Sequence, residues 1–231
     1  MKYFTTILLL IIAAQLAHSQ TYEVGAMIVG ANHVGDVGKT TYIAPNTVGF
    51  GGIVKWNRSP RHAFRASILV ADLRGDDSES NETRRQQRGY SFDNTITEFS
   101  AGLEYTFWEY NVHNGRNVST PYLYTGLTYF LYKASYINSA TKEFRDYDQA
   151  GSVAIPIVLG YKAKMSPSFA VAVEIGARYT FTDDLDGSNP VGIVADNESL
   201  RFGNVNNNDW YIFTGVNFSF TFGRKPCYCN F

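Results

Sequence analysis

Cysteine and long hydrophobic runs are both scarce in this sequence. Only Cys227 and Cys229 occur among its 231 residues. After residue 19 no stretch approaches the ~20 apolar residues that a transmembrane helix needs. No 3.6-residue helical period persists, and no short repeat appears. The elements to look for are therefore strands rather than membrane-spanning helices.

The sequence also has no excess of positive or negative charge, and it has none of the common catalytic motifs. The formal charge is −1, which gives no electrostatic reason to expect nucleic acid as a partner. Beyond residue 19 the histidines are His33, His62 and His113, with neither a G-x-S-x-G motif nor a His/Cys ligand spacing. We expect no enzyme, hence no catalytic residue, and also no cofactor, metal site or small-molecule substrate.

The first 19 residues have the pattern of a secretory signal peptide. Lys2 supplies a positive start, residues 4–16 form a short apolar stretch, and Ala17 and Ser19 place small residues before a cleavage site at Gln20. No cysteine follows that site, so a lipoprotein is not expected. The pattern predicts export to a compartment that permits disulfides.

Period-2 alternation of apolar and polar residues is the main signal in the rest of the chain. Most alternating segments exceed ten residues, which is long for a soluble protein and suits the ~9–11 residues of a tilted membrane-crossing strand. Strands are expected near residues 22–31, 47–57, 62–73, 95–108, 122–133, 152–164, 169–182 and 209–222.

The connections between these strands alternate between long and short, as in outer-membrane barrels. We therefore predict an all-β fold in which residues 20–222 form an eight-stranded antiparallel transmembrane β-barrel in the outer membrane. An even strand count places both termini in the periplasm, with residues 223–231 as a periplasmic tail. Four long outer loops are expected at residues 32–46, 74–94, 134–150 and 183–208, and short periplasmic turns at 58–61, 109–121 and 166–168.

Residue size predicts which face of each strand meets lipid. The interior of an eight-stranded barrel is only wide enough for side chains to fill, so the face rich in Gly, Ala, Ser and Thr is expected inside. The apolar face is expected to contact outer-membrane lipids, with Trp56, Trp108 and Trp210 in aromatic girdles. A soluble ligand carrier would also alternate, but the small inner residues and the girdles disfavour it. The predicted outer faces include Phe99, Ala101, Leu103, Tyr105 and Phe107; Phe169, Val171, Val173, Ile175, Ala177, Tyr179 and Phe181; and Trp210, Ile212, Val216, Phe218, Phe220 and Phe222.

Charged residues on the predicted inner face are nearly balanced. Because buried charges must pair, we interpret them as a salt-bridge plug, and an ion or proton path is the alternative. So narrow a barrel leaves little lumen for transport. The network comprises Glu23, Glu98, Glu104 and Glu174 with Lys55, Arg65, Lys162 and Arg178.

Two charged loop segments have alternative interpretations. Asp183, Asp184 and Asp186 in TDDLDG could bind calcium, but the spaced ligands and terminal Glu of a calcium loop are missing. The arginines of TRRQQR (residues 83–88) could touch lipid phosphates. In both segments a solvated loop is the favoured interpretation.

Several segments together resemble a known family. They are GANHVGDVG, YIAPNTVGFGGIVKWNRSPRHAFRASI, LRGDD, RGYSFDNTITEFSAGLEYTFWEY, TPYLYTGL and the closing FTFGRKPCYC. They resemble the PorG family, outer-membrane barrel components of the type IX secretion system. The resemblance implies a small barrel that is not itself the pore and that associates with a periplasmic ring of the lipoprotein PorK and of PorN. It implies no catalytic residue. A lipid-modifying or adhesive barrel acting through its long loops is the alternative.

The basic tail after the last strand is the predicted contact with that ring. Arg224 and Lys225 suit the boundary between membrane and periplasm, and Pro226 turns the chain away from the barrel. Cys227 and Cys229 are too close in sequence to form an unstrained disulfide with each other. One hypothesis is that one of them bonds a ring partner covalently. The alternative is a pair of thiols or a strained local bridge.

Overall fold

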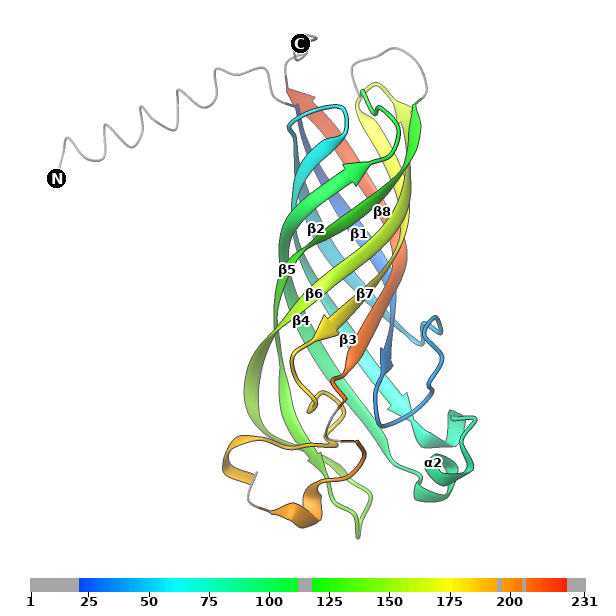
Figure 1. The fold of residues 1–231 in the computed structure, drawn as a ribbon, viewed down its shortest axis with the longest axis vertical. Coiled ribbons are helices and arrows are strands. Elements are labelled where there is room, and N and C mark those ends of the chain that lie inside the picture. Colours follow the sequence, from blue (N-terminus) through cyan, green and yellow to red (C-terminus); the bar gives the residue numbers. More distant parts are fainter. Residues whose placement is uncertain (1–20, 112–117, 195–196, 205–206, 224–231) are drawn as a thin grey trace, which may run out of the picture.

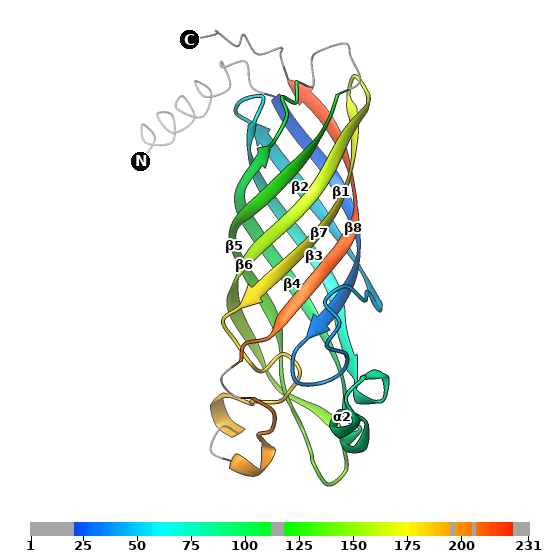
Figure 2. The same cartoon turned by 45° about the vertical axis from the view of Figure 1, so that its right-hand side comes forward.

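The computed structural model describes residues 21–111, 118–194, 197–204 and 207–223. Within these residues eight antiparallel strands form a closed barrel, in which each strand pairs with the next and β8 pairs with β1. Figures 1 and 2 show the strands tilted around one axis. They are β1 (Thr21–Val34), β2 (Thr47–Asn57), β3 (His62–Asp76), β4 (Ser91–Thr106), β5 (Ser119–Ile137), β6 (Phe144–Ser166), β7 (Phe169–Thr180) and β8 (Trp210–Gly223).

The two ends of the barrel differ in what they carry. Thr21 of β1 lies opposite Gly223 of β8, so the first and last strands begin and finish at one end, together with the β2–β3 and β6–β7 turns. We call this the terminal end and the opposite one the loop end. The loop end carries three short helices, η1 (Asp77–Glu79), η2 (Gly192–Val194) and η3 (Glu198–Leu200), and also α2 (Thr83–Arg88). In the described part of the chain no helix is long and apolar enough to cross a membrane.

The predicted number and order of strands are confirmed, but the predicted extent of the third long loop is wrong. Of residues 134–150, only 138–143 lie outside strands, because β5 continues to Ile137 and β6 begins at Phe144. The hairpin projects past the barrel wall, as Figure 1 shows. Residues 144–150 are partly or fully exposed on both faces, so no apolar–polar alternation marked them as strand.

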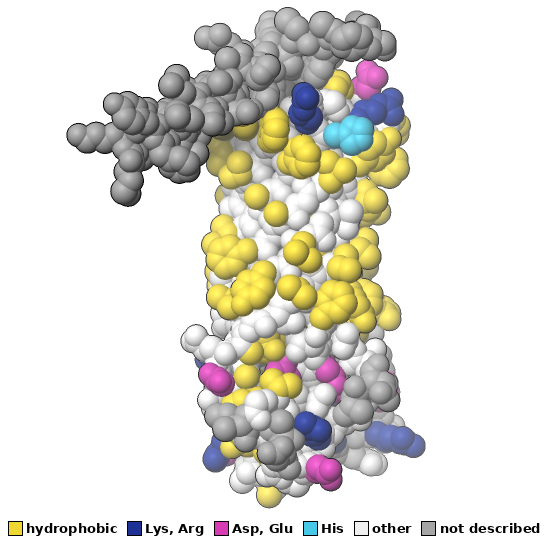
Figure 3. Space-filling view, turned by 60° about the vertical axis from the view of Figure 1, so that its left-hand side comes forward, with side chains coloured by type: hydrophobic (Ala, Val, Ile, Leu, Met, Phe, Trp, Pro, Cys, Tyr) yellow, Lys and Arg dark blue, Asp and Glu magenta, His cyan; other side chains and the backbone are white. Residues whose placement is uncertain are grey.

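The outer wall of the barrel is apolar, as the alternation predicted. In β4 the outward side chains Phe99 and Leu103 are 47% and 39% exposed, whereas Glu98 and Glu104, which flank them on the inward face, are buried. Figure 3 shows one face on which charged side chains gather at the two ends and hydrophobic ones occupy the middle. One predicted lipid contact is wrong. Ile212 is buried beside Asn32, whose side-chain amide bonds to the Tyr42 carbonyl, because the first long loop folds back over the wall there.

The lumen holds larger side chains than the prediction of small inner residues allowed. The inward face of β5 carries Tyr122, Tyr124, Phe130 and Tyr132, all at most 5% exposed. Small residues on neighbouring strands make room for them. A Cβ on Gly160 would lie 2.3 Å from Cζ of Tyr122, so only glycine fits beside that ring. The interior is therefore filled by large side chains set against small ones.

Candidate functional site

The centre of the charged lumen is Glu104 on β4. Its carboxylate lies 2.8 Å from Nζ of Lys55 on β2 and 2.7 Å from Nζ of Lys162 on β6, with the Arg65 guanidinium 3.9 Å away. All four side chains are at most 3% exposed. Three cations thus converge on one carboxylate at a depth where water does not screen them.

A second ion pair continues this group across the lumen. Arg65 donates two hydrogen bonds to Glu174 on β7, at 2.8 and 2.9 Å. The Tyr122 hydroxyl donates to the same carboxylate at 2.6 Å, and the Arg65 guanidinium lies 4.6 Å from the Tyr124 ring centroid. Glu174 is therefore held by a bidentate arginine and a phenol, the strong arrangement for a buried carboxylate.

A third pair lies on the loop-end side of the lumen. Arg178 donates to both carboxylate oxygens of Glu98, at 3.1 and 3.2 Å, and the Tyr211 hydroxyl donates to Glu98 at 2.9 Å. The Arg178 guanidinium also lies over the Phe213 ring at 4.5 Å. Near the terminal end Glu23 accepts hydrogen bonds from Asn57 and Ser219.

The structure therefore brings all eight predicted lumen charges onto the inner face, and each is buried. Seven of them form ion pairs that link five strands, β2, β3, β4, β6 and β7, and Glu23 is held by polar neighbours. The prediction missed the tyrosines, Tyr122 and Tyr211, that complete the bonding of Glu174 and Glu98. On β8, Tyr211 has the same parity as the polar Asn217, Ser219 and Thr221, so its inward position was visible in the sequence. The two apolar faces of β5 gave no such signal for Tyr122. A buried phenol usually finds a hydrogen-bond partner, which could have assigned Tyr211 to an inner carboxylate.

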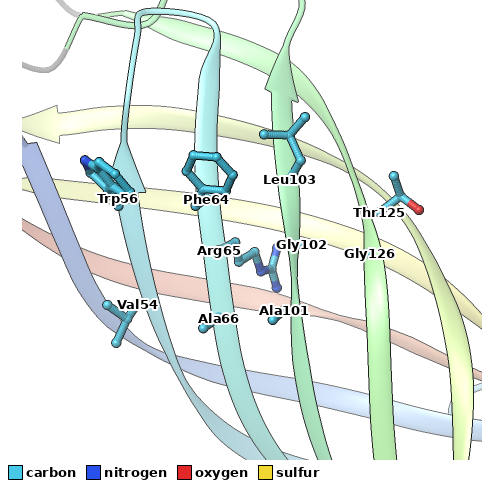
Figure 4. Close-up of a pocket in the computed structure, with 10 residues that line it drawn as sticks. All are labelled: Val54, Trp56, Phe64, Arg65, Ala66, Ala101, Gly102, Leu103, Thr125 and Gly126. Atoms are coloured by element: carbon cyan, nitrogen blue, oxygen red, sulfur yellow. The ribbon is translucent and has the colours of Figure 1, made fainter.

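A shallow hollow indents the outer wall nearer the terminal end, with a volume of about 630 Å³. Figure 4 shows Trp56 and Phe64 side by side on neighbouring strands at one edge of this hollow, with Leu103 on the next strand. Its floor consists of small residues, and a Cβ on Gly102 would lie 2.1 Å from the Thr125 carbonyl oxygen. Most of the lining residues are apolar, and the lining contains one hydroxyl, that of Thr125, but no carboxylate or imidazole.

The loops at the loop end are tied together around Asp77. Its buried carboxylate accepts N–H groups of Gly38 and Tyr90 and two bonds from Arg88. Arg85 donates to the carbonyls of Gly35 and Gly38. The prediction that residues 83–88 form a solvated loop is wrong for Arg85 and Arg88, whose side chains are 14% and 23% exposed, because both bind the first loop.

The acidic segment TDDLDG is also packed inward rather than solvated. Asp184 and Asp186 are fully buried. Asp186 accepts the backbone N–H groups of Asp36 and Val37 at 2.8 and 2.9 Å, while Asp184 accepts the Tyr132 hydroxyl. The segment therefore joins the fourth loop to the first loop and to β5.

Asp209 and His33 form an ion pair at the rim beside this segment. His33 Nε2 lies 3.1 Å from Asp209 Oδ1, and Asp209 Oδ2 accepts the Leu185 N–H at 3.0 Å. Burial, with the nearby Asp186 carboxylate, raises the pKa of Asp209 to about 7 despite the imidazole. Burial and the carboxylates of Asp209, Asp186 and Asp36 raise the pKa of Asp183 to about 8. The rim therefore holds more carboxylates than its cations balance.

The other predicted site residues are either outside the described residues or at the barrel ends. The signal sequence (residues 1–19), His113 and the tail residues Arg224, Lys225, Cys227 and Cys229 fall outside the described residues. His62 is exposed at the terminal end and shares a hydrogen bond with Ser59. His33 is only 5% exposed and engaged by Asp209, so it is not presented to a substrate.

A closed antiparallel barrel with an apolar outer wall and a lumen filled by paired charges is a transmembrane β-barrel. The full chain, residues 1–231, matches the family described as Domain of unknown function (DUF6089), and it belongs to that family. No curated protein is significantly similar to the sequence.

Several solved outer-membrane proteins are similar to this chain at low identity. Ail of Yersinia pestis, in complex with a heparin analogue, is 10% identical, with 88% of this chain and 99% of Ail covered and a TM-score of 0.48. Neisserial surface protein A is 10% identical, with 88% and 97% covered and a TM-score of 0.47. The N-terminal barrel domain of Pseudomonas aeruginosa OprF is 11% identical, with 89% and 98% covered and a TM-score of 0.43. At TM-scores below 0.5 these likenesses carry no inference about function.

Proposed function

We propose that this protein is a non-enzymatic outer-membrane subunit of the type IX protein secretion system. In this role it associates with the periplasmic ring of PorK and PorN and supports assembly of the translocon. The observation that carries the proposal is the lumen, in which buried ion pairs link β2 to β4, β3 to β7 and β4 to β7 across the interior, as in a scaffold rather than a channel. A filled barrel suits a subunit that is not itself the pore, as the resemblance to PorG implies.

The placement of the chain ends supports a periplasmic partner. Thr21 and Gly223 are paired at the terminal end, so the tail after Gly223 departs from the same side as the short turns. With the long loops outside, as is usual for outer-membrane barrels, that side faces the periplasm. Arg224, Lys225, Cys227 and Cys229 follow Gly223 in the sequence, and we propose that they contact the ring.

An enzymatic role is less well supported by the described residues. His33, the histidine at the loop end, is buried and bonded to Asp209. A general base must reach the proton that it abstracts, and this imidazole is covered by the loops. We therefore propose neither a catalytic residue nor a catalytic cofactor for this protein.

The proposal predicts that the barrel purifies together with the ring. An affinity tag inserted at the exposed hairpin tip between Ser139 and Ala140 leaves the tail intact. From native membranes, the tagged protein should bring down PorK and PorN proteins, as identified by mass spectrometry. A Cys227→Ser/Cys229→Ser variant tests whether the link is covalent, because a reductant-sensitive heavy band on a gel should then disappear. Asp93→Asn, at the opposite end, is the matched control and should change nothing. An abundant, folded barrel that brings down neither ring protein would contradict the proposal.

A further inference from the structure

Three buried side chains from distant parts of the chain converge at the loop end. His33 lies near the end of β1, Asp209 immediately precedes β8, and Asp186 belongs to the fourth long loop. One ligand atom from each lies within 4.8 Å of the others, and the three residues are 5%, 1% and 0% exposed. Because the lumen network does not include them, their convergence needs an explanation of its own.

Negative charge is in excess around this group. Asp36 and Asp183, each about half buried, interact electrostatically with Asp186, so four carboxylates surround one imidazole. Arg85 and Arg88 of α2 interact electrostatically with Asp36, but Arg88 makes its side-chain ion pair with Asp77, and Arg85 donates to backbone carbonyls. Buried charges are paired or coordinate a metal ion, and the described cations are too few to pair with these.

Two further observations indicate a missing ligand. Nδ1 of His33, a buried member of the group, has no hydrogen-bond partner among the described residues. Gly35 faces the group, and a Cβ there would lie 2.2 Å from Asp209 Oδ1 and 2.7 Å from His33 Nε2. Gly35 does not have a positive φ, so its backbone does not call for glycine. The lack of a side chain at this position instead lets the backbone of Gly35 approach Asp209 and His33 closely.

We propose that His33, Asp186 and Asp209 bind a divalent transition-metal ion of the zinc type, which locks the first and fourth loops onto the barrel rim. One imidazole with two carboxylates suits zinc or manganese better than calcium, which takes oxygen ligands alone. Tetrahedral ligands with bonds of about 2.0 Å lie roughly 3.3 Å apart, so the three ligand atoms, which lie within 4.8 Å of one another, must move closer together when an ion binds.

The test uses the full chain, folded in detergent and stripped of metal with a chelator. Titration calorimetry with Zn²⁺ should show one saturable site per chain. His33→Gln, which retains a hydrogen-bond donor toward Asp209, should weaken Zn²⁺ binding at least tenfold, and Asp209→Asn should do the same. Asp93→Asn, an exposed carboxylate at the same end that pairs with Arg74, is the matched control and should bind like the wild type. Ca²⁺ should bind at least tenfold more weakly than Zn²⁺.

Folding of each variant is checked by the shift in gel migration between unheated and heated samples. Bound Zn²⁺ should also raise the melting temperature of the wild type and of Asp93→Asn, and leave that of folded His33→Gln unchanged. A folded wild type without saturable Zn²⁺ binding, or a folded His33→Gln that binds Zn²⁺ as tightly as the wild type, would overturn the proposal. The carboxylates would then be balanced by protons.

Discussion

Replacing Glu104 by alanine should destabilise the barrel by about 3–5 kcal/mol. Lys55 and Lys162 lie 2.8 and 2.7 Å from its carboxylate and are almost fully buried. Removal of the carboxylate leaves these charges in the lumen without a counter-ion, and the cost of a buried unpaired charge exceeds that of any lost packing. The free energy of unfolding is measured by urea titration of the protein refolded into lipid vesicles.

The matched control for this prediction is Glu109→Ala. Glu109 is 73% exposed and lies 3.8 Å from Arg61 near the same end, and an exposed pair contributes at most about 1 kcal/mol. If the free energy of unfolding of Glu104→Ala lies within about 1 kcal/mol of the wild-type value, the lumen charges are hydrated rather than held in buried ion pairs.

Arginine in place of Leu159 should cost roughly 2–4 kcal/mol for a residue near the bilayer midplane. Leu159 lies in the middle of the membrane-facing part of β6, between Leu123 and Ile175 on the adjacent strands, and is 54% exposed. Its exposure is to lipid on our account, so a guanidinium there loses its water. The same vesicle titration measures the effect.

Ser139→Arg provides the control for the lipid-facing wall. Ser139 is exposed in the turn of the projecting β5–β6 hairpin, where a new charge meets water and should change stability by less than about 0.5 kcal/mol. Equal and small effects of Leu159→Arg and Ser139→Arg would mean that the barrel wall faces water, as in a soluble carrier.

The strands and the charged lumen were predictable because each leaves a local signal. In β4, polar Glu98, Ser100 and Glu104 alternate with apolar Phe99 and Leu103, so both the strand and its buried face follow from period 2. The pairing of inner charges followed from the cost of burying them singly. Which carboxylate met which cation did not follow, because that depends on strand register and tilt.

The interior of β5 could not be assigned in the same way. Both of its faces are apolar, with Leu123 and Leu127 outward and Tyr122 and Phe130 inward. Alternation therefore gave no contrast, and the expectation of small inner residues misjudged this strand. Glycines on the facing strands, such as Gly160, carry the missing information, since they provide the space that the rings fill.

The packed loops were unpredictable for a different reason. Asp186 bonds to the backbone of Asp36 and Val37, 150 and 149 positions away along the chain. No periodicity links such positions, and the composition of each segment alone is that of a solvated loop. Only closure of the barrel brings the first and fourth loops together. The rim cluster of His33, Asp186 and Asp209 therefore depends on the strand topology and has no local signal in the sequence.

The most direct test of whether the barrel is plugged and does not conduct ions is a current recording across a planar lipid bilayer that contains the purified protein. The ion pairs of Glu104, Glu174 and Glu98 fill the lumen from β2 to β7, and an eight-stranded barrel has no room for a water channel beside them. We predict that insertion of the folded protein adds no discrete current steps above those of the protein-free bilayer. Reproducible steps of fixed conductance from the wild-type protein would contradict the account and make the lumen a pathway.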